Sequence, residues 1–331
     1  MKKRTIAILL VSLCFGLAAL SYISQGALFE AETYVMRHWS LRLALFSLIA
    51  FLLTWLSPAL KLMLLCAKRR RLSLPLALST HMAGTFGAAV TPGNSGGGPA
   101  TTLALQHLGM SLGQAIGIAM QIFILDLLYF VWSVPLSLGY VFWRDDMKLS
   151  GRLNSLSFIA LLLAFALALI LTRYPKWVVA FMLRLAKLPL LKRFSMNFEK
   201  MARDYYRSTQ DYYAFNWYQF LALQGVTALS WLSNFALFWG LLKLYGFETS
   251  LWQVMSSLNL ITLIAHFIPT PGGSGFIEFA ISLATSGSLT HSDIAAPLLI
   301  WRLSTYYLIF LLGPLAAWFI YRQALTPTDA L

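Results

Sequence analysis

Thr91-Pro92-Gly93-Asn94-Ser95-Gly96 recurs in the second half of the chain as Thr270-Pro271-Gly272-Gly273-Ser274-Gly275. Each copy follows an apolar segment (72–91 or 251–269) and precedes a shorter segment of helical pattern (98–109 or 275–287). Proline and glycine at this density break a helix and leave backbone N–H and C=O groups without helical partners. The repeated pattern therefore predicts two helical hairpins, over 72–109 and 251–287, each with a broken tip. The simpler interpretation is that each Pro-Gly pair ends a helix at a loop.

The rest of the chain indicates that these hairpins lie in a membrane. Of the 331 residues, 59% are hydrophobic and only 11% are charged, whereas an ordinary soluble domain is about 25% charged. A membrane-spanning helix needs roughly 20 apolar residues. The composition excludes soluble globular, disordered and fibrous proteins and predicts a single integral membrane domain over 1–331, all-α and polytopic. Its eight apolar blocks are 5–24, 41–66, 72–91, 113–142, 153–171, 216–243, 251–269 and 294–321.

The distribution of positive charge predicts how the blocks cross the membrane. Loops rich in Lys and Arg stay in the cytoplasm. If all eight blocks span, the basic segment 172–215 falls outside. If 72–91 and 251–269 are re-entrant arms, 18 Lys and Arg residues (Lys61 among them) face the cytoplasm, six face outside and Arg302 lies in a span. This second arrangement predicts six full spans, two re-entrant hairpins in an inverted repeat, and cytoplasmic N- and C-termini. The block after Met1-Lys2-Lys3-Arg4 is interpreted as an uncleaved first span rather than a secretory signal.

Broken helices that meet from opposite sides predict a binding site in the middle of the membrane. Inverted repeats of this kind are typical of secondary transporters. The arms after the tips begin at helix N-termini, whose free N–H groups and positive dipole ends suit an anion such as a phosphate. The candidate substrate-binding residues are Thr91, Pro92, Gly93, Asn94, Ser95, Gly96, Thr270, Pro271, Gly272, Gly273, Ser274, Gly275, Glu278 and Arg302.

Five ionisable residues lie inside or beside the apolar blocks, where charge is costly and usually functional. Glu278 and Arg302 could pair, and an anionic headgroup could compete for the planar guanidinium; a purely structural pair is the alternative. Asp126 is a candidate coupling site, with capping of the first hairpin's broken backbone as the alternative. His81 and His266 precede the two tips and are candidate proton relays or ordinary hydrogen-bonding groups.

The tips and the segments after them resemble the transmembrane region of lysylphosphatidylglycerol synthase, a flippase-like family of bacterial and archaeal membrane proteins. The resemblance covers nearly the whole chain and implies movement of lipids or lipid-linked headgroups across the bilayer. Many members carry Glu and then Arg soon after the first tip, where this chain has Gly98 and Ala100-Thr101-Thr102. The soluble aminoacyl-transferring domain of the fused synthases is missing. The stretches that carry the resemblance are Thr91-Pro92-Gly93 to Gly98-Pro99, Gly109-Met110-Ser111-Leu112-Gly113-Gln114-Ala115, Asp126-Leu127-Leu128, Ile268-Pro269-Thr270-Pro271-Gly272-Gly273-Ser274-Gly275 with Glu278, and Trp301-Arg302-Leu303-Ser304-Thr305-Tyr306-Tyr307 with Gly313.

The leading functional hypothesis is therefore a lipid translocator, not an enzyme, in a prokaryotic cell membrane. Its expected partners are membrane lipids with anionic headgroups and not nucleic acid, because the net charge of +13 suits headgroups in a membrane protein. No metal or cofactor is expected: Cys14 and Cys66 lie in apolar blocks, and there is no nucleotide-binding glycine loop. A scaffold that recruits a biosynthetic enzyme and an intramembrane lipid-phosphate enzyme are the alternatives. The lipid, the direction of transport, the coupling ion and the oligomeric state stay open.

Overall fold

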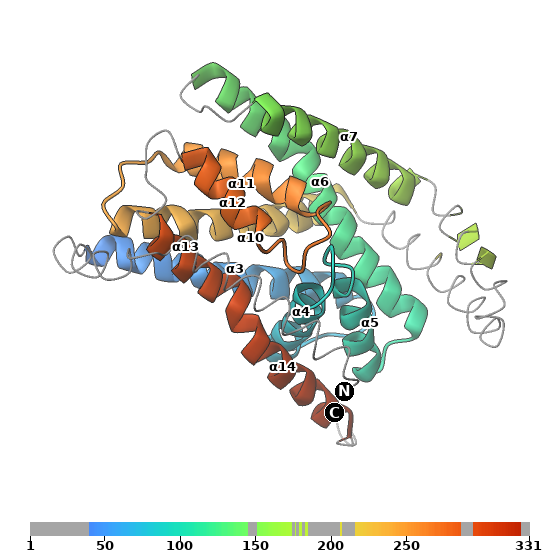
Figure 1. Ribbon diagram of the computed structural model, residues 1–331. Coiled ribbons are helices and arrows are strands. Elements are labelled where there is room, and N and C mark those ends of the chain that lie inside the picture. Colours follow the sequence, from blue (N-terminus) through green and yellow to red (C-terminus); the bar gives the residue numbers. More distant parts are fainter. Residues whose placement is uncertain are drawn as a thin grey trace.

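The protein is all-helical in the part of the chain that the structure describes. The computed structural model in Figure 1 describes residues 40–144, 151–173, 216–285 and 294–325, together with a few positions between 176 and 206. Regular structure within those ranges consists of helices and one isolated β-bridge. The predicted first span at 5–24 and most of the predicted basic segment 172–215 lie outside the described residues.

The described helices follow the same order in each half of the chain, namely one long helix, two short helices and a second long helix. In the first half these are α3 (Leu41–Cys66), α4 (Leu74–Ala89), α5 (Gly97–His107) and α6 (Leu112–Arg144), with α7 (Gly151–Arg173) following. In the second half they are α10 (Trp217–Leu244), α11 (Leu251–Ala265), α12 (Phe276–Thr285), and α13 (Ala295–Arg302) continuing into α14 (Leu308–Leu325). A π-helical turn, Leu303–Tyr307, joins α13 to α14.

Four of the predicted spans are confirmed as helices long and apolar enough to cross a membrane: Leu41–Cys66, Leu112–Trp143, Trp217–Leu244 and Ala295–Gln323. The predicted span at 153–171 is also helical, since α7 has 23 residues, within which Ser155–Leu167 is apolar. The bounds agree with the sequence because apolar length decides where a helix can cross hydrocarbon.

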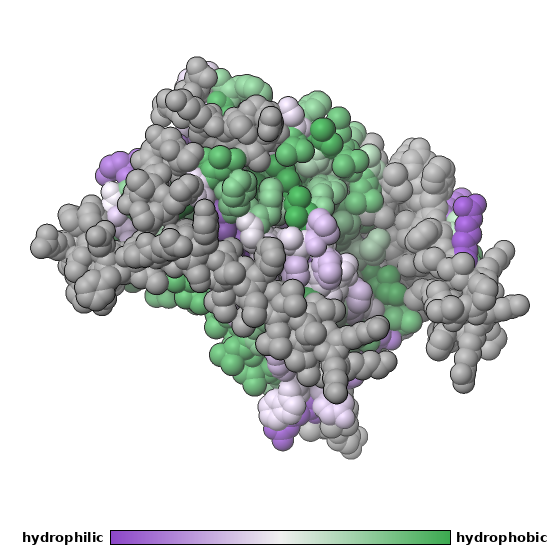
Figure 2. All heavy atoms as spheres, viewed as in Figure 1, coloured by the Kyte–Doolittle hydropathy of each residue, from purple (hydrophilic) through white to green (hydrophobic). Residues whose placement is uncertain are grey.

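Many large apolar side chains are exposed on the outside, whereas the Glu278–Arg302 ion pair lies inside. Leu136, Trp143 and Leu311 are 67%, 82% and 64% exposed, whereas Glu278 and Arg302 are 0% and 4% exposed. In Figure 2 much of the described surface on the visible face is green, and paler, more polar residues interrupt it near the middle. Charges leave water only when they are paired, so this inverted distribution is that of a protein whose surroundings are lipid.

Both predicted hairpins are pairs of short helices joined by a turn. Helices α4 and α5 pack closely because glycines face the partner helix: a Cβ on Gly84 would lie 2.2 Å from Oγ1 of Thr101. In the second hairpin, helix α11 packs on α12. Helix α11 ends at Ala265 rather than at the predicted residue 269. Pro269 and Pro271 explain the earlier end, since the residue before a proline disfavours the helical conformation.

Each hairpin packs against a long helix of the other half. Helices α4 and α5 contact α14, while α11 contacts α6 and α7 (Figure 1). The long helices α3 and α10 pack along each other. A small apolar cluster of Trp55, Ala89, Tyr306 and Ile309 joins α3, the end of α4 and the π-helical turn. Because each hairpin packs on the other half of the chain, the two hairpin turns come together in the interior.

Candidate substrate site between the two hairpin turns

The tips of the two hairpins touch each other. Pro92 and Pro271 form an isolated antiparallel β-bridge. The hydroxyl of Tyr306, which lies in the π-helical turn, is 3.3 Å from the carbonyl oxygen of Ala89 and 3.2 Å from that of Pro271, so it can donate to either hairpin. The candidate residues 91–96 and 270–275 thus lie together rather than apart.

The first turn is closed by its own hydroxyl groups. Thr91 donates through Oγ1 to the carbonyl of Gly87 at 2.8 Å and accepts the backbone N–H of Gly96 at 2.7 Å. Ser95 donates through Oγ to the carbonyl of Pro92 at 2.9 Å. Asn94 adopts a φ of 57°, a left-handed conformation that asparagine tolerates better than most residues. The hydroxyl groups of Thr91 and Ser95 are therefore already hydrogen-bonded within the first hairpin turn.

The second turn has the same pattern but leaves its hydroxyls unengaged. The buried Oγ1 of Thr270 and Oγ of Ser274 have no hydrogen-bond partner among the described residues, although Ser274 lies beside the hydroxyl of Tyr306. Gly272, at a φ of 59°, lies so close to Tyr306 that a Cβ would come within 2.0 Å of the ring. Glycine is thus required at this position by both conformation and space.

Glu278 and Arg302, expected from the sequence to pair, form a buried ion pair beside the second turn. The carboxylate of Glu278 accepts the backbone N–H of Gly275 at 2.7 Å through Oε2 and Nε–H of Arg302 at 2.5 Å through Oε1. Glu278 is the third residue of α12. A glutamate at this position can accept a hydrogen bond from a free backbone N–H at the start of its own helix. The guanidinium carbon of Arg302 lies 4.8 Å from the centre of the Tyr306 ring.

One donor of this pair has no acceptor among the described residues. Nη2 of Arg302 is buried and has no hydrogen-bond partner in the described part of the chain. Burying such a group without a partner is costly, more so for a charged one. An incoming anion with several oxygen atoms would satisfy this donor, which is how guanidinium groups hold phosphates. The other buried hydroxyls of this region that lack a described partner belong to Thr270, Ser274 and Tyr307.

Asp126 lies in a second ion pair, on α6. Its Oδ1 accepts Nζ–H of Lys61 at 2.8 Å and Nε1–H of Trp231 at 3.1 Å. Its partners are thus side chains from α3 and α10 rather than backbone N–H groups of the first hairpin turn, so the capping interpretation is not supported. Lys61 was expected from the sequence to lie among the cytoplasmic charges. Its side chain is only 4% exposed and points to Asp126, so Lys61 is a buried charge of the helix bundle rather than an exposed loop charge.

The two histidines lie near this second pair, and no chain of hydrogen bonds among the described residues joins them to it. His81 lies on α4, 6.0 Å from the Trp55 ring between ring centres, and is close enough to Lys61 and Asp126 for both charges to act on it. His266 follows α11; its Nδ1 is 2.7 Å from the carbonyl of Thr262 and its ring centre is 5.8 Å from that of Trp231. Both stay candidates for coupling.

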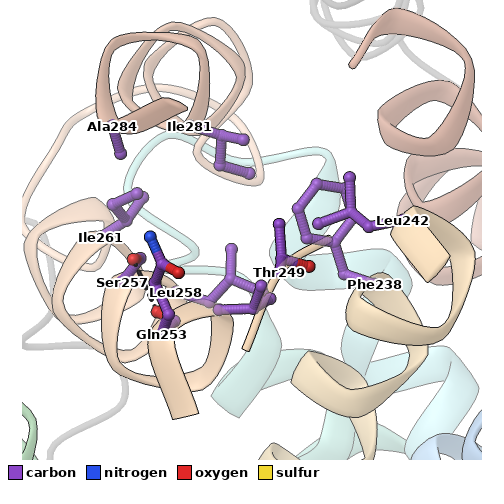
Figure 3. Close-up of a pocket in the computed structure, with 10 residues that line it drawn as sticks. Phe238, Leu242, Thr249, Gln253, Ser257, Leu258, Ile261, Ile281 and Ala284 are labelled. Atoms are coloured by element: carbon purple, nitrogen blue, oxygen red, sulfur yellow. Dashed lines mark hydrogen bonds between the residues drawn. The ribbon is translucent and has the colours of Figure 1, made fainter. Parts of the chain in front are cut away.

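A separate small cavity of about 40 Å³ lies between α10, α11 and α12. Figure 3 shows Ile281 and Ala284 of α12 facing Gln253, Ser257 and Ile261 of α11 across it. This volume is enough for about one or two water molecules and too small for a lipid headgroup, so we do not assign the cavity as the substrate site. Within the described residues, no three His, Cys, Asp or Glu side chains come together as metal ligands.

Three residues of these sites escaped the sequence analysis. Lys61 was hidden by the neighbouring cluster Lys68-Arg69-Arg70-Arg71, although a lysine inside an apolar block is itself a signal. Trp231 and Tyr306 look like ordinary membrane aromatics in the sequence. Only the three-dimensional arrangement shows that one bonds a carboxylate and the other bridges the two turns.

The fold and the buried charges together define a multi-pass helical membrane protein with two interrupted hairpins around a polar interior. Residues 5–313 match the sequence model of the lysylphosphatidylglycerol synthase TM region, so the chain belongs to that family. It is also similar to a UPF0104 membrane protein of Archaeoglobus fulgidus, with 27% identity over 281 residues, which are 81% of this chain and 84% of that protein. The resemblance noted from the motifs is thereby confirmed.

Proposed function

We propose that the protein is a lipid translocator, not an enzyme, which carries the anionic headgroup of a phospholipid or lipid-linked sugar past the two hairpin turns. The observation that carries the proposal is the buried guanidinium of Arg302, with an unpartnered Nη2, at the point where the turns meet. An anion there would compete with Glu278 for the guanidinium. Binding would then loosen the contact between α12 and α13 and so change the structure.

The proposal includes an inverted repeat with re-entrant hairpins. Supporting it are the equal order of helices in the two halves and the packing of each hairpin on a long helix of the other half. Such repeats place the substrate between broken helices near the membrane centre. In the proposed topology, α4 and α5 enter from the cytoplasm, α11 and α12 enter from outside, and both termini are cytoplasmic in a prokaryotic cell membrane.

Two cysteine variants test this topology at matched positions. Ser73 and Glu248 both lie exposed, just before the first short helix of their hairpin. In a background without Cys14 and Cys66, a membrane-impermeant maleimide added to intact cells should label Glu248→Cys and leave Ser73→Cys unlabelled until the cells are opened. Labelling of both positions from the same side would contradict the inverted repeat.

Transport is tested by reconstitution with fluorescent lipids that differ only in their headgroups. Arg302→Ala should abolish movement of anionic lipids to the opposite leaflet, and Arg302→Lys should restore only part of it because lysine lacks the planar fork. Arg322→Ala is the matched control, since Arg322 lies exposed on α14 against Trp318. Unchanged lipid movement in a folded Arg302→Ala protein would overturn the site.

The two alternatives give different results in the same assay. An enzyme would convert a labelled lipid phosphate into a new product, and a scaffold would neither move nor convert any lipid. The partner of such a scaffold would be a biosynthetic enzyme, recovered by co-purification with the full chain.

A further inference from the structure

The two buried carboxylates of this protein differ in how fully they are engaged. Both oxygens of Glu278 accept hydrogen bonds and its side chain is 0% exposed. Both bonds to Asp126 fall on the same atom, Oδ1, from Lys61 and Trp231. Oδ2 of Asp126 has no partner among the described residues, and 24% of that side chain is exposed. Asp126 therefore has one open, accessible oxygen inside an apolar bundle.

We propose that Asp126 is a proton-binding site, with the proton taken up on Oδ2. The existing bonds leave room for it, because Oδ1 of the neutral acid can still accept from Lys61 and Trp231. The carboxylate loses its negative charge and the ammonium of Lys61, whose side chain is 4% exposed, keeps its positive one. Each proton bound thus leaves one uncompensated positive charge in the interior.

The groups around Asp126 come from several helices. Lys61 faces it from α3 and Trp231 from α10, and the charge of Asp126 acts on His81 of α4. His266, at the end of α11, reaches it only through the Trp231 ring. On α5 the titratable His107 lies beside Tyr321 instead, with the ring centres 6.2 Å apart, and the described side chains of α7, 155–167, include none that titrates.

A structural ion pair alone would account for the burial but not for the open oxygen. A buried carboxylate is stabilised when its oxygens accept hydrogen bonds, as both oxygens of Glu278 do. At Asp126, by contrast, Oδ2 has no described partner and the side chain is 24% exposed, while the side chain of Lys61 is only 4% exposed. A proton can reach this carboxylate without first breaking the pair, which is what reversible protonation requires.

The consequence for transport rests on the proposed function. The uncompensated charge of Lys61 favours an anion in the same interior, so proton uptake and headgroup binding would reinforce each other. This linkage is reciprocal, since bound anion would also favour the protonated form. The proton site itself stands independently of what is transported.

The test is a pH-difference infrared spectrum of the full chain in lipid, read at the C=O stretching band of protonated carboxyl groups. A band should appear on acidification of the wild type and be missing in Asp126→Asn. Glu248→Gln removes an exposed carboxylate that pairs with Lys243; it is the control and should keep the band of Asp126. In Lys61→Met the band should persist to higher pH, because the cation that favours the carboxylate is gone.

Two further variants keep the test decisive if Asp126→Asn does not fold. Asp126→Glu retains an acid and should shift the frequency of the band, and Lys61→Met with Asp126→Asn removes both charges together. The proton site would be overturned if the wild type showed no acid-dependent C=O band, or if its band were the same in all of these variants. A band that responds as expected, together with the absence of lipid movement, would leave the site standing and refute the proposed function instead.

Discussion

The two hairpin turns carry the same Thr-Pro-Gly-x-Ser-Gly pattern and do different chemical work. In the first turn, the hydroxyl groups of Thr91 and Ser95 form hydrogen bonds with nearby backbone groups. In the second, Thr270 and Ser274 keep theirs buried and without a described partner, next to the Glu278–Arg302 pair. The pattern therefore specifies a turn, and the neighbouring charges decide whether that turn can also bind an anion.

This difference gives the two halves of an otherwise repeated fold separate roles. Tyr306 connects the two turns, and we expect the first turn to stay fixed while the second moves. The pattern in the first half lacks the carboxylate that caps α12, because Pro99 stands where Glu278 stands after the second turn.

The largest expected effect comes from breaking the buried ion pair. Glu278→Gln leaves the guanidinium of Arg302 buried without its counterion, and removing one partner of such a pair destabilises a protein by about 3–5 kcal/mol. Thermal or denaturant unfolding in detergent measures this. The same amide at the matching position of the first hairpin, Pro99→Gln, should change stability by less than about 0.5 kcal/mol because Pro99 is exposed. Equal losses of unfolding free energy in Glu278→Gln and Pro99→Gln would contradict the proposed difference between the two hairpin turns.

A glycine comparison isolates the space around each turn. Gly272→Ala places a Cβ within 2.0 Å of the Tyr306 ring, whereas the nearest atom to a Cβ on Gly93 is 4.0 Å away. Both glycines have a φ near 60° (59° and 58°). We expect Gly93→Ala to cost about 1–2 kcal/mol from conformation alone, and Gly272→Ala to cost a further 1–3 kcal/mol from overpacking. The difference in unfolding midpoint between the two variants checks this.

A threonine comparison separates stability from binding. Thr91→Val removes the acceptor of the Gly96 N–H, so we expect a loss of about 1–3 kcal/mol in unfolding free energy. Thr270→Val replaces a hydroxyl that has no described partner, so stability should hold or rise. Its expected defect is weaker binding of anionic lipid, measured by titration of headgroup analogues. A Thr270→Val protein that is unstable but binds normally would reverse the assignment of roles.

Much of the fold could be predicted from the sequence, because a few strong physical constraints decide it. Hydrocarbon thickness determines helix length, as at Leu41–Cys66, and Pro-Gly pairs determine where the hairpins break. The pairing of Glu278 with Arg302 also follows from the sequence, since charges in an apolar segment need partners. What apolar length and turn residues cannot give is which elements from distant segments come to touch.

The parts that sequence could not predict all depend on such contacts. Lys61 looks cytoplasmic until α3 is placed beside α6, and the network of Asn259 with Ser133 and Ser137 appears only when α11 lies on α6. The contrast between the two turns is hidden for the same reason. The matching Thr and Ser residues have different hydrogen bonds, and the second turn lies beside Arg302 and the ring of Tyr306.

The smallest expected effect on stability tests the connection between the turns. Tyr306→Phe removes a hydroxyl that lies 3.3 Å from the Ala89 carbonyl and 3.2 Å from that of Pro271, so a loss of about 0.5–1.5 kcal/mol is expected. The aromatic ring next to Arg302 is kept, which preserves the cation–π contact. Tyr307→Phe is the control, since that hydroxyl has no described partner and its removal should not destabilise the protein.

The same variant should have a larger effect on transport than on folding. If the Tyr306 hydroxyl transmits movement of the second turn to the first, Tyr306→Phe slows lipid movement in proteoliposomes even where the protein is fully folded. A folded Tyr306→Phe protein with a wild-type rate would mean that the bridge between Pro92 and Pro271 holds the turns together without help, and that the hydroxyl serves only packing. The ratio of the two effects therefore distinguishes a mechanical link from a structural one.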